Sequence, residues 1–252
     1  MKDSHLKRDN RENFIFGRNA VCEALKSGRN IESVLLSCKE ISGSLKVILS
    51  LAKERKIPVK NVKKDFLDEI SGTLNHQGVA AAVGAKETCR IDDILDFAQS
   101  KNEAPFVIVA DGIEDPHNLG AIIRTAECAG AHGVIIPSRR AVGLTAAVDK
   151  ASAGALEHML IARVGNIGAA IDELKEKGLW IYGADMNGES WNGVDLKGAV
   201  ALVIGSEGFG IGNLVRKKCD FILSLPMKGK INSLNASVAA GILMYEVRRQ
   251  RG

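Results

Sequence analysis

Hydrophobic positions in the first part of the chain alternate between helical and extended spacing. Apolar side chains at positions 45, 48, 49 and 52 recur three and four residues apart, which predicts a helix over residues 44–55. Similar patterns predict helices at 18–26 and 64–70 and strands at 31–37, 57–62 and 78–83. Together they indicate a small α/β unit. The polar stretch 87–104, with a short helix at 91–98, is the expected linker to the rest of the chain.

The second part of the chain has a more regular pattern of short apolar runs that begin every twenty to thirty residues. These runs are residues 106–110, 134–136, 159–162, 179–183, 200–204 and 221–225. Runs that are apolar on both faces and separated by helix-length segments predict a parallel sheet covered on both sides, the doubly wound class. Because ligands bind beyond the carboxyl ends of such strands, the segments of chemical interest are 111–118, 184–189, 205–212 and 226–237.

Composition narrows the class of protein. The chain has 252 residues, of which 46% are hydrophobic and 25% charged, and this is typical of a globular protein with two unequal domains or one large domain. The net charge of +4 is too small to indicate nucleic-acid binding by itself. Residues 53–64, however, carry six lysines and arginines against Glu54 alone. This basic strip is either a phosphate-contact surface or a solvated helix face. Aromatic residues, at 4%, weigh against a binder built on stacking platforms.

Several other classes do not fit. The five cysteines are far apart and form no CxxC pair, which argues against a disulfide framework and against zinc, and favours a reducing cytoplasm. Residues 1–13 are charged and lack the apolar core of a signal peptide, and no apolar run approaches the roughly 18 residues of a membrane span. No two histidines have the spacing of metal ligands, so we expect no metal site.

The glycine-rich segment 205–212 resembles a nucleotide-binding loop only superficially. No G-x-G-x-x-G follows the first strand of the sheet, and Gly229-Lys230 lacks the upstream glycine of a Walker A loop. We therefore expect neither NAD nor ATP. The segment also holds Glu207, which we expect to be a buried carboxylate. It is either a functional group or the cap of a helix that starts near Gly210.

Two further segments carry polar residues at strand ends. In the first, Asn118 stands at a plausible helix N-cap, and Arg124 follows in an otherwise apolar helix, where it must pair with Glu127 or Glu207 or face a cleft. In the second, Ser233 and Asn235 precede the last helix, and capping explains only one of them. Two loop lysines, Lys228 and Lys230, lie in the same segment.

Together these segments resemble a known family. Asn118-Leu-Gly-Ala-Ile-Ile-Arg124-Thr-Ala, Ile204-Gly-Ser-Glu207-Gly, and Leu225-Pro-Met followed by Ser233-Leu-Asn235-Ala-Ser237 are similar to motifs one, two and three of the SpoU (TrmH) RNA ribose 2′-O-methyltransferases. They occur in the family's order at family-like separations, over residues 105–252. The stretch from Phe16-Gly-Arg-Asn-Ala-Val to Asn75-His-Gln-Gly-Val-Ala resembles the family's substrate-binding domain.

The resemblance implies a SPOUT-type catalytic domain with a trefoil knot at its carboxyl end, an amino-terminal RNA-binding domain like ribosomal protein L30e, S-adenosylmethionine as cofactor and a homodimer formed through the knotted domain. The expected divisions are a flexible tail at 1–12, the RNA-binding domain at 13–86, the linker at 87–104 and the methyltransferase domain at 105–252. Periodicity alone would have predicted an unknotted sheet, because knots are rare exceptions to the topology rules.

The resemblance also assigns residues. The catalytic set is Arg124, Asn118, Glu207, Ser233 and Asn235. The cofactor would contact Gly183, Ala184, Ile204, Gly205, Leu225, Met227 and Leu234. RNA would contact Arg18, Lys60, Lys63, Lys64, Lys228 and Lys230. An arginine is a poor base because a guanidinium gives up its proton very reluctantly, so we expect Arg124 to hold the neighbouring phosphate and to stabilise alkoxide charge.

The target is expected to be a guanosine of 23S rRNA, because the fused amino-terminal domain and the amino-acid sequence of residues 111–137 are most similar to family members with that substrate. Two alternatives stay open at this point. The first is a tRNA-directed 2′-O-methyltransferase of the same family, and the second is a catalytically silent RNA-binding or ribosome-assembly factor on the same scaffold.

Overall fold

The computed structural model describes residues 14–37, 43–72 and 75–252, so the tail predicted at 1–12 lies outside the described residues. The chain packs into two units. One contains the described residues up to Lys86 together with Leu144–His158, and the other contains Glu87–Gly143 and Met159–Gly252. The segment Leu144–His158, which lies within the expected methyltransferase domain by sequence, therefore packs with the amino-terminal unit.

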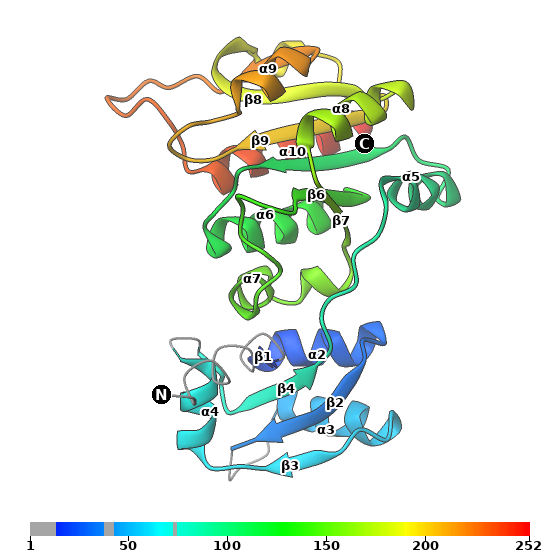
Figure 1. Ribbon diagram of the computed structural model, residues 1–252, viewed down its shortest axis with the longest axis vertical. Helices are drawn as coiled ribbons and strands as arrows, with labels where there is room; N and C mark the ends of the chain where they lie inside the picture. The colour runs from blue at the N-terminus through cyan, green and yellow to red at the C-terminus, as the bar shows by residue number, and fades with distance from the viewer. Residues whose placement is uncertain (1–13, 38–42, 73–74) are drawn as a thin grey trace. The chain divides into compact units, whose positions relative to one another are not determined.

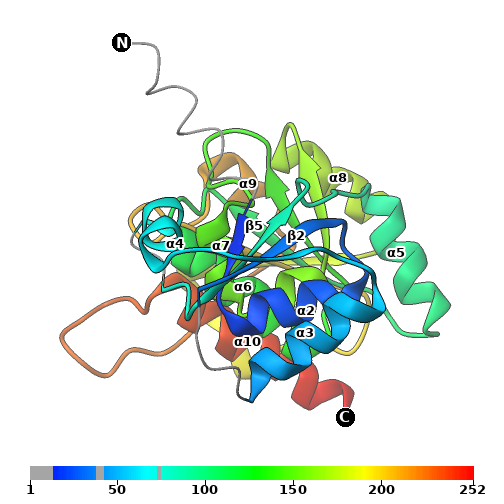
Figure 2. The same ribbon diagram turned by 90° about the horizontal axis from the view of Figure 1, so that it is seen from below.

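The amino-terminal unit is a four-stranded sheet covered on both faces. Its elements are β1 (Phe14–Phe16), α2 (Arg18–Ser27), β2 (Ile31–Leu36), α3 (Ser44–Glu54), β3 (Val59–Asn61), α4 (Lys64–Ser71), β4 (Val79–Val83), α7 (Ala146–Ser152) and the 3-10 turn η1 (Ala155–Glu157). The strand order is β1-β4-β2-β3. Helices α2 and α3 lie side by side (Figure 2) and bury Leu25, Leu45 and Ile48 against one face of the sheet. On the other face, Leu67 of α4 packs with Phe16 and Leu35.

A buried group of charges ties Leu144–His158 to the rest of this unit. Arg29 Nη1 lies 2.9 Å from Asp149 Oδ2 and also pairs with Glu157. Lys86 approaches the same Glu157 at 3.9 Å. Burial, reinforced by the neighbouring Glu157 carboxylate, raises the pKa of Asp149 to about 6. A protonated Asp149 leaves the Arg29 guanidinium facing a single buried carboxylate, which is the less costly arrangement.

The second unit is built on a six-stranded sheet in which every strand pairing is parallel. Its strands are β5 (Phe106–Asp111), β6 (Gly133–Pro137), β7 (Leu160–Val164), β8 (Trp180–Ser190), β9 (Val200–Gly205) and β10 (Phe221–Ser224). Its helices are α5 (Ile91–Ser100), α6 (Pro116–Ala129), α8 (Ile167–Glu176), α9 (Asn213–Lys218) and α10 (Ala236–Arg251), with the 3-10 turn η2 (Trp191–Gly193). The strand order is β10-β8-β9-β5-β6-β7.

Helices cover both faces of this sheet, which confirms the predicted class. Helices α5, α8 and α9 are labelled in Figure 1, and their apolar residues share one core with residues of β5 to β9. On the opposite face, α6 packs against α10, and Ile122, Ile123, Leu243 and Met244 are fully buried there. Strand order alone does not define how the chain threads, so the trefoil knot stays a prediction of the family resemblance.

Two predicted strands differ in length from the observed ones. The predicted strand 57–62 is only three residues long, because β3 is an edge strand whose residues are all exposed. The predicted strand 179–183 extends to Ser190, past a break in register against β10. At this break Gly188 lies so close to β10 that a Cβ would stand 2.3 Å from the Ile222 carbonyl oxygen. Only glycine fits so close to the neighbouring backbone.

Candidate active site

A cavity of about 330 Å³ lies at the carboxyl ends of β8, β9 and β10. Its walls come from the middle of β8, the end of β9 and the glycine-rich loop after it, the loop between β10 and α10, and the first turns of α10. The residues that line it are Ala184, Asp185, Met186, Ile204, Gly205, Ser206, Glu207, Gly208, Phe209, Gly210, Leu223, Leu225, Met227, Asn232, Ser233, Leu234, Ala236, Ala239 and Leu243. The loop after β10, drawn in orange, projects well beyond the sheet in Figures 1 and 2.

The glycine-rich loop has a shape fixed by its backbone. Ser206 and Gly210 exchange two backbone hydrogen bonds, of 3.1 and 2.8 Å. A Cβ on Gly205 would stand 2.0 Å from the carbonyl carbon of Gly210, and Gly210 itself has φ +63°. Asp111, at the end of β5, accepts a 2.9 Å hydrogen bond from the backbone N–H of Gly212. The loop therefore forms one wall of the cavity in a single conformation set by two glycines and one carboxylate.

Asn235 connects all three motif segments. Its Oδ1 caps α10 by accepting hydrogen bonds from the N–H groups of Ser237 (3.0 Å) and Val238 (3.3 Å). Its Nδ2 donates to Asn118 Oδ1 at 3.0 Å and to Glu207 Oε1. One amide thus holds the start of α6, the glycine-rich loop and the start of α10 in fixed relation. Capping was expected to account for one of Ser233 and Asn235, and that residue is Asn235. The cap uses only the Oδ1 of its amide and leaves the Nδ2 for the other two segments.

Asn118 is not the N-cap of α6, and that prediction was wrong. The helix begins two residues earlier, at Pro116, and the side chain of Asp115 accepts the capping hydrogen bond from the N–H of His117. Proline is favoured at the first helical position because its missing N–H would have no partner there. Asn118 is consequently a buried residue of the first turn, free to bond Asn235.

Glu207 also differs from expectation in two respects. Its side chain is exposed, not buried. It caps no helix, because α9 starts only at Asn213 and Gly212 precedes it. The carboxylate instead accepts the hydrogen bond from Asn235 at the mouth of the cavity. The exposure follows from the loop, whose backbone turns outward between Ser206 and Gly210.

Two members of the expected catalytic set stand apart from this network. Arg124 is exposed on α6 and forms no ion pair with Glu127, Glu207 or any other residue that the structure describes. Its charge is therefore exposed to solvent, and Arg124 is not among the residues that line the cavity. Ser233 lines the cavity and is exposed, and within the described part of the chain its hydroxyl has no protein partner.

Six of the seven expected cofactor residues line the cavity, and Gly183 does not. Gly183 instead packs inward, where a Cβ would lie 2.8 Å from Ile211 and 2.9 Å from Cys219 Sγ. The lining residues not predicted as site residues include Asp185, Met186, Phe209 and Asn232. Each lies in one of the segments that follow a predicted strand. Their position after a strand could therefore have identified them, whereas their residue types could not.

The expected RNA-contact residues fall into two groups, one in each unit. In the amino-terminal unit, Arg18 and Lys64 line one cavity of about 470 Å³ together with Ser37 and His76. Lys60 and Lys63 are exposed nearby, on β3 and just before α4. In the second unit, Lys228 and Lys230 are exposed on the loop after β10.

One member of the basic strip is structural. Arg55 donates to the carbonyl oxygens of Ala24, Leu25 and Arg29 and so joins the end of α3 to the turn after α2. Its guanidinium is therefore engaged within the fold.

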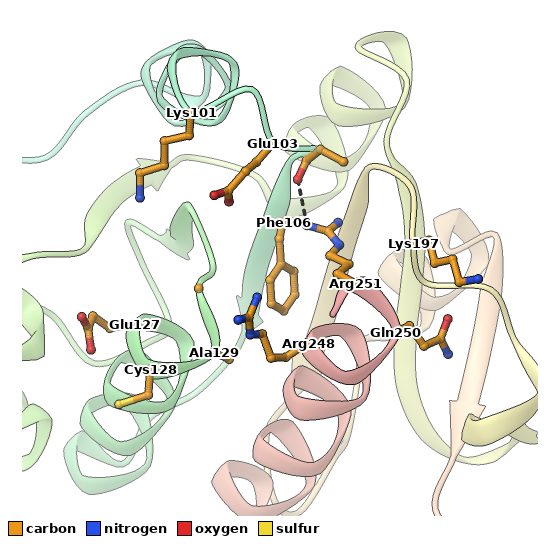
Figure 3. A pocket seen from close by; sticks show the side chains of 12 residues that line it. Lys101, Glu103, Phe106, Glu127, Cys128, Ala129, Lys197, Arg248, Gln250 and Arg251 are labelled. Carbon is orange, nitrogen blue, oxygen red and sulfur yellow. Dashed lines mark hydrogen bonds between the residues drawn. The ribbon is translucent and has the colours of Figure 1, made fainter.

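A larger cavity of about 650 Å³ lies at the opposite, amino-terminal end of β5 (Figure 3). Its main feature is Arg251, which donates to the carbonyl oxygens of Ala104 (2.8 Å), Pro105 (3.0 Å) and Gly198 (2.5 Å). Burial lowers the pKa of this guanidinium. Arg251 fastens the last helix to the strand ends, and none of the motif residues reaches this cavity. Size alone therefore does not identify the active site.

Within the described residues, no cluster of three or more histidine, cysteine, aspartate or glutamate side chains could hold a metal ion. In the same part of the chain, no helix combines the length and apolar character needed to cross a membrane.

Comparison with known proteins assigns both parts of the chain. Residues 105–245 match the SpoU rRNA Methylase family, and residues 14–89 match the RNA 2′-O ribose methyltransferase substrate-binding family. A protein of Bacillus subtilis (strain 168) named as a TrmH family tRNA/rRNA methyltransferase, YacO, is 49% identical over 239 residues, which are 94% of this chain and 96% of that protein. A TrmH family relative from Staphylococcus aureus (strain MSSA476) is 45% identical over 241 residues, 95% of this chain and 97% of that protein.

Solved structures agree with this assignment. The SpoU methyltransferase AviRb from Streptomyces viridochromogenes, solved in complex with the cofactor AdoMet, has a TM-score of 0.80 and 26% identity and covers 99% of this chain and 94% of its own. The TrmH/SpoU tRNA modifying enzyme of A. aeolicus has a TM-score of 0.54 and 26% identity, covering 64% of this chain and 83% of its own. The two family matches and the near-complete alignments establish that the chain belongs to the SpoU (TrmH) family of RNA 2′-O-ribose methyltransferases.

Proposed function

We propose that the chain binds S-adenosylmethionine in the 330 Å³ cavity and methylates the ribose 2′-hydroxyl of a guanosine in 23S rRNA. The observation that carries the proposal is the Asn235 amide, which joins motifs one, two and three at the mouth of a cavity lined by six of the expected cofactor residues. AviRb, similar over almost the entire chain, was solved with AdoMet.

The residues of the cavity suit this cofactor. Ile204, Leu223, Leu225 and Leu243 provide apolar walls for a flat ring, and the loop backbone from Gly205 to Gly210 provides polar groups. A Cβ on Gly208 would meet nothing within 4 Å, so the loop leaves open space beside its backbone. When bound, S-adenosylmethionine supplies an electrophilic methyl group. Transfer of that group needs in-line positioning more than it needs a metal.

The remaining residues would position and activate the ribose. Arg124, exposed and without an ion-pair partner in the described part of the chain, is suited to bind a phosphate beside the target ribose and to stabilise charge on its 2′-oxygen. Ser233 and Glu207 line the same cavity and are suited to hold the hydroxyl and to accept its proton. Asn118 and Asn235 would act by keeping these groups in place.

RNA docking is assigned to the amino-terminal unit. Arg18 and Lys64 share a cavity, and Lys60 and Lys63 stand exposed beside it, which favours phosphate contact over a merely solvated face. Charge reversal of Lys60, Lys63 and Lys64 should flatten the dependence of RNA affinity on salt by about one unit of slope per lost phosphate contact. An unchanged slope in filter binding at several salt concentrations would show that these lysines only face solvent.

The catalytic unit is proposed to form a homodimer through its knotted domain. Val238 and Tyr245 stand seven residues apart on α10 and are 50% and 52% exposed. That spacing puts both on one helix face, which a second copy could cover. Sedimentation velocity of the wild type and of Tyr245→Asp tests this proposal, and a monomeric wild type would refute it.

A ribosomal target is favoured over tRNA by the description of the matched catalytic family, which is named for rRNA methylases. The tRNA modifying enzyme of A. aeolicus covers only 64% of this chain, so about a third of the chain has no counterpart in that enzyme. Because such a target and the free cysteines Cys22, Cys89, Cys128 and Cys219 fit a reducing compartment, we place the enzyme in the cytoplasm.

The decisive experiment maps ribose methylation in total RNA from cells with and without the gene. Loss of one guanosine mark in 23S rRNA is expected. Loss of a tRNA mark would overturn the substrate and leave the chemistry intact. Calorimetry with S-adenosylmethionine separates the enzyme from a silent assembly factor, since binding is required only of the enzyme.

A further inference from the structure

Phe209 is the most exposed large hydrophobic side chain in the described part of the chain, at 96%. It stands between Gly208 and Gly210, and within the same described residues its ring makes none of the aromatic or cation contacts seen elsewhere in the protein. A side chain so exposed contributes almost nothing to folding through burial. Its place at this position therefore calls for another explanation.

The exposure is imposed by the backbone. The paired hydrogen bonds between Ser206 and Gly210 close the turn on one side of Phe209, and Ile211 is buried in the core on the other, with 4% exposure. The N–H of Gly212 is held by Asp111. A ring on so well fixed a turn is presented outward in a defined direction, which lowers the entropic cost of binding to it.

The ring lies at the cavity to which the proposed function assigns the cofactor and the acceptor ribose. Phe209 lines the mouth of the cavity and is two residues from Glu207, which bonds Asn235. The inner walls of the cavity are supplied by other apolar residues, among them Ile204 and Leu243, which are almost wholly buried. A cofactor inside the cavity thus has its own apolar contacts, and the outward ring is available to whatever comes next to it.

The charges around this mouth favour RNA as that partner. Arg124, Lys228 and Lys230 are exposed on the segments that form or adjoin the site, and none of them forms an ion pair within the residues that the structure describes. Two acidic side chains also line the cavity: Asp185 is paired with Arg216 at 2.9 Å, and Glu207 accepts the hydrogen bond from Asn235. Exposed lysines on a loop that also lines this cavity, together with one flat apolar ring, fit a polyanion with flat bases better than they fit the apolar face of a second protein copy.

We propose that Phe209 stacks on a base within one nucleotide of the ribose to be methylated, and so contributes to the choice of that nucleotide. The inference rests on the proposed function. Stacking would hold the base out of its helix, and this would bring the attached ribose to the cavity mouth. The scarcity of aromatic residues, 4% of the chain, is consistent with one stacking position in place of an extended platform.

The test compares Phe209 variants with a matched control. Phe209→Ala and Phe209→Leu should each lower kcat/KM for the methylated transcript about 5- to 150-fold, the range of one base–aromatic stack, while Phe209→Trp should stay near wild type. The affinity for S-adenosylmethionine, measured by calorimetry, should change by less than about twofold, since stacking involves no cofactor contact. Leu214→Ala is the control, because Leu214 is 77% exposed on α9 and does not line the cavity.

Three results would overturn the inference. If Phe209→Leu keeps full activity, the contact is apolar and not a stack. If S-adenosylmethionine affinity falls in step with activity, the ring covers the cofactor. If Phe209→Ala changes the sedimentation coefficient from dimer to monomer, the ring contacts a second copy.

A second arm tests the base itself. Three transcripts are compared, each abasic at the target nucleotide or at one of its two neighbours. On one of them the wild type and Phe209→Ala should have equal kcat/KM, since the stack is then already lost. A difference that persists on all three would refute the inference. A wild type that methylates neither 23S rRNA nor tRNA transcripts would refute the proposed function as well, whereas an active wild type matched by Phe209→Ala would refute the stacking alone.

Discussion

Replacing Asn235 with serine should separate the two roles of this side chain. Its Oδ1 caps α10 through the N–H groups of Ser237 and Val238, and its Nδ2 reaches Asn118 and Glu207. Serine is about as good an N-cap as asparagine, but its shorter side chain has no second donor to reach across the site. Alanine removes both functions.

The size of each effect follows from these bonds. Loss of an N-cap costs about 0.5–2 kcal/mol, which lowers Tm by about 2–4 °C per kcal/mol in a domain of this size. A hydrogen bond to a charged group is worth about 1.5–3 kcal/mol, or roughly 10- to 150-fold in rate where it positions the reacting groups. Glu207 is exposed, so we expect the lower end of that range. Asn235→Ser should thus lose at least about tenfold in kcat at nearly unchanged Tm.

The assays are differential scanning calorimetry and methyl transfer from labelled S-adenosylmethionine. Ser237→Ala is the matched control, because the Ser237 hydroxyl donates to the same Asn235 Oδ1 at 2.6 Å and takes no part in the bridge to Asn118 and Glu207. It should keep nearly full activity. The reasoning fails if Asn235→Ser keeps wild-type kcat, or if it loses as much thermal stability as Asn235→Ala.

Two further predictions concern the glycine-rich loop and the buried charges of the amino-terminal unit. Gly205→Ala should abolish S-adenosylmethionine binding in calorimetry while leaving the sheet folded by circular dichroism, because its Cβ would stand 2.0 Å from the Gly210 carbonyl carbon; measurable binding would refute the close approach. Burial raises the pKa of Asp149 to about 6, so its stabilising contribution is present below its ordinary value of 3.8 and is lost as pH rises through about 6. Relative to Asp149→Asn, the wild type should lose up to about 3 kcal/mol of unfolding free energy between about pH 4 and pH 7 in urea titrations, and parallel pH profiles of the two proteins would contradict the shift.

Sequence periodicity predicted most helices and strands because the helices bury one apolar face and the strands of the parallel sheet are apolar on both faces. The helix predicted at 44–55 is α3, and its apolar positions Leu45, Ile48 and Ala52 are all fully buried. Strand order could not be predicted in the same way, since β9 lies between β8 and β5 through pairings between distant residues. The packing of Leu144–His158 with the amino-terminal unit was equally hidden, because it depends on Arg29, more than a hundred positions away.

The error at Asn118 shows why local rules fail at a functional site. Residue type alone makes Asn118 an acceptable cap, yet Asp115 followed by Pro116 is the stronger signal for a helix start and was present in the sequence. Moving the start by two residues turns Asn118 from a group that satisfies its own helix into one that must find a distant partner, and Asn235 Nδ2 is that partner. Conversely, Asn235 obeys the capping rule and still has a donor left over. Some polar residues have hydrogen-bonding groups that their local partners do not satisfy. Such a residue is therefore a better marker of this site in the sequence than one that simply occurs beside a helix end.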